Sequence, residues 1–157
     1  MVDSPRIDTA QRLIHASAGA VWSAFADAQA WTHWLPPSDM TCEIEQFDFR
    51  EGGGYRLALI YQDEEIAGKS GEHRDISSGT FLKLVPNERM VQLVEFDADD
   101  PQFAGSMRMT WQLDQENAGT RVTISAEDVP PGISPEDHAE GMNSTLENLT
   151  RLVENEP

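Results

Sequence analysis

The chain has 157 residues, of which 39% are hydrophobic and 25% are charged, and this composition is that of one ordinary globular domain. Its 28 aspartates and glutamates outnumber its 11 lysines and arginines, so the formal net charge is −17. Such a charge repels the phosphate backbone of nucleic acids and anionic membrane surfaces, so we expect neither as a partner. We predict a single domain over residues 1–157, with its core at 7–154.

The N-terminus has no long apolar core of the kind found in signal peptides, and no stretch approaches the roughly 18 apolar residues of a membrane-spanning helix. We therefore expect a cytoplasmic protein. The single cysteine, Cys42, excludes an intramolecular disulfide and a CxxC metal site. Because Cys42 lies in a predicted strand, we expect it to be a small buried residue rather than a nucleophile.

The chain begins with a predicted strand and two short predicted helices. The alternation of residues 7–14 favours a strand. Ser17 is a suitable N-cap for a helix over residues 18–26, and Asp27 can cap a second short helix that ends before two consecutive prolines.

Between residues 41 and 127 apolar and polar side chains alternate, and glycine, asparagine and proline interrupt the alternation where tight turns need them. Short connections between consecutive strands favour antiparallel pairing, and the alternation gives each strand one dry and one wet face. The predicted strands lie near residues 42–49, 54–62, 72–85, 89–96, 106–115 and 119–127.

A long helix is predicted from Pro135 to about Glu154, with Ser134 as its N-cap. Its apolar residues recur at spacings of three and four, so one side of the helix must lie against an apolar surface, and the dry face of the sheet is the available partner. Gly141 interrupts this helix, where glycine is unfavourable relative to alanine. Either a close approach or open space beside it explains the glycine, or it is a tolerated surface residue.

These elements predict an α+β fold in which a curved antiparallel sheet of six or seven strands surrounds a long C-terminal helix. Two short helices follow the first strand and hold the sheet away from the long helix. An arrangement of this kind tends to leave a pocket between the sheet and the helix.

Four groups of residues follow one another along the chain in a characteristic order. They are Val21-Trp22 with Trp31-Thr32-His33-Trp34-Leu35-Pro36-Pro37; Phe47-Asp48-Phe49-Arg50-Glu51-Gly52-Gly53-Gly54-Tyr55-Arg56; Gly79-Thr80-Phe81-Leu82-Lys83-Leu84-Val85-Pro86-Asn87-Glu88-Arg89-Met90-Val91; and Gly119-Thr120-Arg121-Val122-Thr123, followed by Pro130-Pro131-Gly132-Ile133 and Gly141-Met142. Together they resemble the signature of the activator of heat-shock-protein-ATPase-like (AHSA-like) family, and the resemblance spans residues 7–154.

This resemblance implies the helix-grip fold of the START-like, birch-pollen-allergen-like (SRPBCC) superfamily, which encloses a ligand cavity. The superfamily includes lipid and hormone carriers, polyketide cyclases and co-chaperone domains, so the fold does not fix the function. The eukaryotic co-chaperone carries an additional N-terminal domain that we do not find in this chain. We therefore do not expect this chain to activate a chaperone ATPase. The expected partner is a small, largely apolar molecule.

Aromatic rings, methionines and histidines on the predicted dry faces are the candidate wall of this cavity, although such residues at a spacing of two usually form the core. His33 and Trp34 belong either to the wall or to the core. His138 either reaches the cavity or pairs with a neighbouring carboxylate. The predicted ligand-binding residues are His33, Trp34, Tyr55, Leu57, Leu59, Tyr61, His73, Met107, Met109, Trp111, His138 and Met142.

The sequence has no nucleophile with an adjacent base, no cofactor-binding loop and no local metal spacing among its four histidines. We therefore expect a binding protein without a metal or cofactor. The alternative is a cyclase- or hydrolase-type enzyme. In an extended segment His73 and Asp75 share a face and could form a proton-transfer dyad, and Glu95 could place a carboxylate near the cavity. Each of these side chains could equally be an ordinary surface charge.

A third interpretation is a co-chaperone-like module that binds another protein, and this function would need an exposed apolar patch. A homodimer is compatible with the sequence, but no feature of the sequence establishes one.

Overall fold

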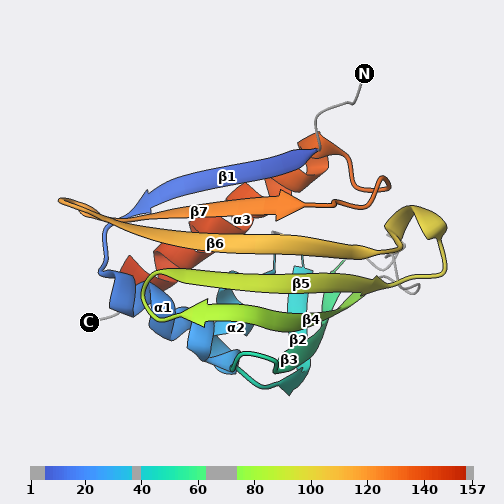
Figure 1. Ribbon diagram of the computed structural model, residues 1–157, viewed down its shortest axis with the longest axis horizontal. Coiled ribbons are helices and arrows are strands. Elements are labelled where there is room, and N and C mark those ends of the chain that lie inside the picture. Colours follow the sequence, from blue (N-terminus) through green and yellow to red (C-terminus); the bar gives the residue numbers. More distant parts are fainter. Residues whose placement is uncertain (1–5, 37–39, 63–73, 155–157) are drawn as a thin grey trace.

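The computed structural model describes residues 6–36, 40–62 and 74–154 (Figure 1). Seven strands and three α-helices follow one another in the predicted order, so the α+β prediction is confirmed. The elements are β1 (Ile7–Ile14), α1 (Ala18–Ala26), α2 (Ala28–Trp34), β2 (Met40–Phe47), β3 (Gly54–Tyr61), β4 (Arg74–Val85), β5 (Arg89–Asp97), the short 3-10 helix η1 (Pro101–Phe103), β6 (Ser106–Glu116), β7 (Gly119–Glu127) and α3 (Pro135–Glu154).

All seven strands belong to one sheet with the order β1-β7-β6-β5-β4-β3-β2, and every neighbouring pair is antiparallel. Figure 1 shows α3 crossing behind β1, β7 and β6, while α1 and α2 lie near the C-terminal end of α3. The sheet and the long helix form the predicted helix-grip fold.

The sheet curves where its strand pairing changes register. One register shift lies between Ile44 and Gln46 of β2, and another lies between Phe81 and Lys83 of β4. An extra residue in one strand of an antiparallel pair bends that strand and increases its twist. The two irregularities therefore help the sheet to wrap around α3.

The helices begin at the predicted caps. The Ser17 hydroxyl accepts a hydrogen bond from the Ala20 amide at 3.1 Å, and the Asp27 carboxylate accepts one from the Gln29 amide at 2.9 Å. Ser134 accepts the Asp137 amide at 3.1 Å in the same way at the start of α3. Each cap satisfies an amide that has no partner within its own helix.

A dense aromatic core fills the space between the sheet, the two short helices and the C-terminal half of α3. Neighbouring ring centroids lie 5.0–6.1 Å apart, mostly in edge-to-face or tilted geometry, which is the favoured arrangement for aromatic pairs. Leu146 and Leu149 of α3 are fully buried in this core. The rings belong to Trp22, Phe25, Trp31, Trp34, Phe47, Phe49, Tyr55, Phe81 and Trp111.

Within the described residues, no helix has both the length and the apolar character needed to cross a membrane.

Candidate functional site

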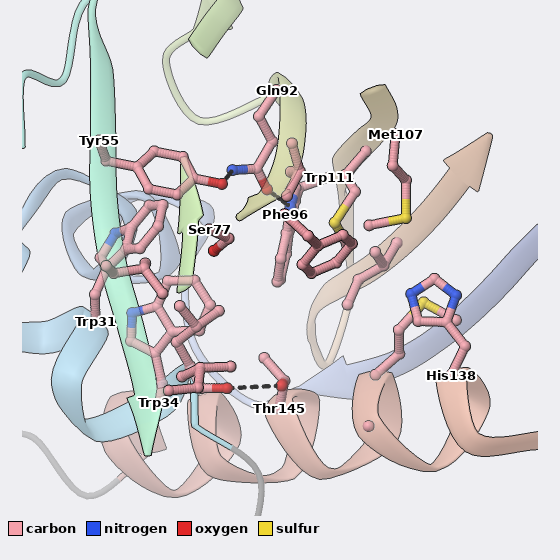
Figure 2. A pocket seen from close by; sticks show the side chains of 18 residues that line it. Trp31, Trp34, Tyr55, Ser77, Gln92, Phe96, Met107, Trp111, His138 and Thr145 are labelled. Atoms are coloured by element: carbon pink, nitrogen blue, oxygen red, sulfur yellow. Dashed lines mark hydrogen bonds between the residues drawn. The ribbon is translucent and has the colours of Figure 1, made fainter. Parts of the chain in front are cut away.

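A cavity of about 170 Å³ lies between the N-terminal half of α3 and the inner face of the sheet, next to the aromatic core (Figure 2). Its wall is contributed by α2, α3 and strands β3 to β7. The residues lining it are Trp31, Trp34, Leu35, Tyr55, Leu57, Leu59, Ser77, Gln92, Val94, Phe96, Met107, Met109, Trp111, Ile124, His138, Gly141, Met142 and Thr145.

The periodicity of each element explains which side chains reach the cavity. Successive side chains of a strand point to opposite faces of the sheet, so every second residue of β3, β5 and β6 faces inward. In α3 the lining residues before and after the adjacent pair Gly141 and Met142 lie three or four positions from it, which places all of them on one side of the helix. They are His138, Gly141, Met142 and Thr145.

The two tryptophans of α2 form an apolar end wall. Trp31 is 1% exposed and Trp34 is fully buried. Their indole nitrogens donate hydrogen bonds to the backbone carbonyls of Phe25, at 2.7 Å, and Ala24, at 3.0 Å. Because both N–H groups are satisfied by the backbone, these rings present apolar surface to the cavity.

A buried glutamine joins two aromatic residues on opposite sides of the cavity wall. The Gln92 side-chain amide donates to the Tyr55 hydroxyl at 2.9 Å, and its carbonyl oxygen accepts a hydrogen bond from the Trp111 indole at 2.7 Å (Figure 2). Burial raises the pKa of Tyr55, so its hydroxyl stays protonated. This bridge fixes both rings at the edge of the cavity.

Gly79 allows the Tyr55 ring to pack directly against β4. A Cβ atom built on Gly79 would sit 2.1 Å from the Tyr55 ring, which is far closer than two carbon atoms can approach. A glycine is therefore required at this position if Tyr55 is to reach Gln92.

His138 forms the polar end of the cavity with two residues at the start of the chain. Its Nδ1 lies 2.7 Å from Asp8 Oδ2, and Asp8 also accepts hydrogen bonds from Arg6 Nη2 at 2.8 Å and Arg6 Nε at 3.0 Å. The side chains of His138 and Asp8 are only 12% and 9% exposed. The hydrogen bonds from Arg6, and to a smaller extent that from His138, lower the pKa of Asp8, although burial opposes this effect.

The remaining lining residues include two hydroxyls and one glycine. Thr145 donates a hydrogen bond to the Leu35 carbonyl at 3.0 Å, whereas the Ser77 hydroxyl lies among the apolar lining residues (Figure 2). A Cβ atom built on Gly141 would meet no atom within 4 Å. Of the explanations for this glycine, the structure therefore favours open space beside the helix.

Most residues predicted for ligand binding lie together in this wall. For His138, both alternative predictions are confirmed. It reaches the cavity and it pairs with a carboxylate. The predicted residues that line the cavity are Trp34, Tyr55, Leu57, Leu59, Met107, Met109, Trp111, His138 and Met142.

Two predicted lining residues lie elsewhere. His33 is exposed and borders a shallow depression with Asn148 and Arg151, because it lies on the side of α2 opposite the core, so its assignment to the cavity wall is wrong. Tyr61 lies near the end of β3 and donates a hydrogen bond to Asp75 Oδ2 at 3.2 Å instead of lining the cavity. His73 lies outside the described residues.

The structure also bears on the proposed proton-transfer groups. Glu95 is exposed on the outer face of β5 and accepts a hydrogen bond from Ser106 at 2.7 Å, so its expected place near the cavity is wrong. The inward residues of β5 are those in phase with Gln92, while Glu95 is out of phase with them. Asp75 is 6% exposed and accepts a hydrogen bond from Tyr61. Because His73 lies outside the described residues, the proton-transfer dyad of His73 and Asp75 stays a prediction.

Several lining residues were not predicted, among them the polar Gln92 and Ser77, and neither was Asp8, the carboxylate that contacts His138. Gln92 and Ser77 sit in phase with apolar residues of β5 and β4, and Asp8 sits in phase with buried Ala10 of β1. A polar residue in step with the apolar face of a strand is the signal that could have identified them.

The described residues contain no group of three or more histidine, cysteine, aspartate or glutamate side chains that could hold a metal ion. Cys42 is partly buried against the core, and desolvation, with a smaller effect from Glu43, raises the pKa of its thiol to about 11. A raised pKa disfavours the reactive thiolate, in agreement with the expectation that Cys42 is a packing residue.

The family model of the Activator of Hsp90 ATPase homolog 1-like protein matches residues 15–154. The chain belongs to this family. The match covers α1, α2, the strands from β2 to β7 and all of α3, and β1 lies just before it. Membership in this AHSA-like family and its helix-grip superfamily confirms the resemblance found in the sequence.

Solved structures of proteins from other organisms have the same fold. A crystal structure of a protein from Chromobacterium violaceum superposes with a TM-score of 0.85 at 29% identity, covering 96% of this chain and 98% of that one. The AHSA1-like protein from Aeromonas hydrophila gives a TM-score of 0.73 at 21% identity, with 95% and 92% covered. A protein from Staphylococcus epidermidis gives 0.75 at 17% identity, with 98% and 92% covered. No curated protein matches this chain.

Proposed function

We propose that this protein binds a small, largely apolar molecule in the cavity between the sheet and α3. The observation that carries the proposal is an apolar space of about 170 Å³ beside a core that is otherwise packed ring against ring. Ligand sites in proteins are typically concave and mostly apolar, with a few polar groups that orient the ligand. The wall described above has this composition.

The empty space weakens the fold, which supports a role for it. Apolar side chains that border an unfilled space lose the packing contacts that they would make in a filled core, so the space lowers stability. Gly141 costs about 1 kcal/mol more than alanine in the interior of a helix. Both costs occur at the same place, and they are explained together if the space is kept for an occupant.

The size of the cavity limits the class of ligand. Pockets for drug-sized molecules measure about 300–1,000 Å³, whereas an engineered apolar cavity of about 150 Å³ binds benzene. A cavity of about 170 Å³ therefore suits a single ring or a short branched chain. The net charge of −17 disfavours an anionic ligand, because the field of the whole protein repels it.

Toluene titrations followed by NMR test this function, with the methyl groups of Met107, Met109 and Met142 as reporters inside the cavity. We expect saturable shifts of these signals in the wild type. Gly141→Leu places a side chain in the open space and should weaken toluene binding at least tenfold. Glu140→Leu introduces the same side chain at the preceding, exposed position of α3 and should bind toluene as the wild type does.

Two results would contradict the proposal. One is the absence of saturable shifts at the three methionines in the wild type. The other is unchanged toluene affinity in a folded Gly141→Leu variant, because binding would then occur outside the cavity.

The structure offers less support for a module that binds another protein. Among the described residues, the exposed large apolar side chains are Ile7 and Leu82. They lie on β1 and β4, which are separated in the sheet by β7, β6 and β5, so they do not form one patch. We therefore do not propose a chaperone as the partner.

A further inference from the structure

The apolar cavity has one end where a hydrogen-bonding group is held in a fixed orientation. Nδ1 of His138 contacts Asp8 Oδ2 at 2.7 Å, and Asp8 is in turn held by two hydrogen bonds from Arg6. An ionised carboxylate only accepts hydrogen bonds, so the contact requires the hydrogen atom of the imidazole to sit on Nδ1. The charge-assisted pair with Arg6 keeps Asp8 ionised and in place.

This arrangement leaves the second imidazole nitrogen, Nε2, for the cavity. His138 is one of the lining residues, and Figure 2 shows its ring at the end of the cavity, rising from α3 toward Met107 of β6. Among the described residues, Nε2 of His138 has no hydrogen-bond partner, whereas the one buried side-chain nitrogen or oxygen without a partner is Arg89 Nε, so Nε2 is not fully buried. In a neutral imidazole whose hydrogen is on Nδ1, Nε2 is a hydrogen-bond acceptor.

The indole N–H groups and the Thr145 hydroxyl of the wall are already engaged. Trp31 and Trp34 donate to backbone carbonyls, Trp111 donates to Gln92, and Thr145 donates to Leu35. The polar groups left to meet a ligand are therefore few, and His138 is the one whose ring is oriented by a buried carboxylate, so that Nε2 accepts a hydrogen bond when the imidazole is neutral.

We propose that His138, oriented by Asp8 and Arg6, accepts a hydrogen bond from the hydroxyl group of a neutral ligand, so that the preferred ligands are hydroxylated single rings of the phenol type. This inference rests on the proposed function and names the substrate class of the same cavity. A wholly apolar cavity rejects a hydroxyl, because burying it without a partner costs its lost hydrogen bonds to water. An acceptor at one end removes that penalty and selects hydroxylated rings over plain ones.

The test compares phenol with toluene, which has the same ring and a methyl group in place of the hydroxyl. In the wild type we expect phenol to bind at least as tightly as toluene. In His138→Leu we expect the ratio of phenol affinity to toluene affinity to fall about tenfold, the size of the loss when a buried hydroxyl loses its partner. His33→Leu makes the same change at an exposed position outside the cavity and should leave the ratio unchanged.

A spectroscopic measurement on the unmodified protein covers the case in which His138→Leu does not fold. A long-range proton–nitrogen NMR spectrum should show the hydrogen of His138 on Nδ1, and the Nε2 resonance should move on addition of phenol but not of toluene.

The outcomes separate the two proposals. If toluene binds in the cavity but phenol binds much more weakly, the role of His138 is wrong. The same conclusion follows if the Nε2 resonance does not shift when phenol is added. In both cases the proposal that the cavity binds an apolar molecule is still supported. If Ser77→Ala lowers the ratio and His138→Leu does not, the acceptor is Ser77 and the inference is wrong. If neither probe binds, both proposals fail.

Discussion

Asp8 joins two side chains that come from opposite ends of the chain, Arg6 and His138. It accepts hydrogen bonds from Arg6, two residues away, and from His138, which is 130 residues away in sequence. Through these contacts one small carboxylate ties the edge strand β1 to the first turn of α3. The same contacts decide which imidazole nitrogen faces the cavity.

Replacing Asp8 by asparagine should therefore lower stability in a pH-dependent way. At neutral pH, Asp8→Asn should reduce the free energy of unfolding by about 1.5–3 kcal/mol, as hydrogen bonds to a charged group do. The pKa of Asp8 is lowered by folding, so its stabilisation is complete above about pH 4, where an unfolded aspartate is ionised, and is lost as the pH falls through its folded value. Urea unfolding at a series of pH values measures the difference between the two proteins.

That difference should shrink as the pH falls below about 4. A difference of equal size at pH 3 and pH 7 would contradict an ionised, hydrogen-bonded Asp8. Asp114→Asn, at an exposed position of β6, is the control and should change the free energy of unfolding at neutral pH by less than about 0.5 kcal/mol.

Cys42 should be nearly inert toward thiol reagents in the folded protein. With the pKa of the thiol raised to about 11, the thiolate at pH 8 amounts to about one molecule in a thousand, against roughly a quarter of an unfolded cysteine. Because a thiolate of higher pKa is also more nucleophilic, labelling by a chromogenic disulfide should be about tenfold or more slower in buffer than in concentrated urea. Equal rates in the two solvents would show that the thiol is not desolvated.

At the scale of elements, β3 and β4 position the aromatic end of the site through one close contact. The Tyr55 ring packs directly on Gly79, and this packing carries the Tyr55 hydroxyl to Gln92. The position of one side chain in the wall therefore depends on the absence of a side chain on the neighbouring strand.

Gly79→Ala should displace the Tyr55 ring and destabilise the protein by about 1–3 kcal/mol, the usual cost of overpacking a core. Chemical denaturation gives the stability, and the indole N–H signal of Trp111 reports whether the Gln92 bridge survives. Gly141→Ala is the matched control and should raise the free energy of unfolding by up to about 1 kcal/mol. Alanine is favoured over glycine in the interior of a helix, and the new methyl group meets open space. A loss of stability in both variants would contradict this account of the two glycines.

The elements themselves could be predicted closely, because their signals are local. Caps at Ser17, Asp27 and Ser134 marked the helix starts, and alternation with turn residues marked the strands. The orientation of β5 was harder, because apolar residues occupy both of its faces and alternation alone does not say which one is buried. The assignment of Glu95 to the cavity failed for this reason.

At the scale of the whole molecule, the space between the sheet and the helices has two parts. Beneath α1, α2 and the C-terminal half of α3 it is packed with aromatic rings, and beneath the N-terminal half of α3 it holds the cavity. The apolar strand residues of the cavity could be predicted from their spacing of two. The Asp8–His138 contact could not, because nothing in either segment specifies a partner 130 residues away.

The open space beneath α3 is tested most directly by a crystal structure of the protein under xenon pressure, since xenon enters apolar cavities of this size. We predict xenon density bounded by Leu57, Met109 and Gly141, and its loss in Gly141→Leu. A structure without xenon at this place, in which the methionines of β6 fill the space against α3, would contradict the central claim.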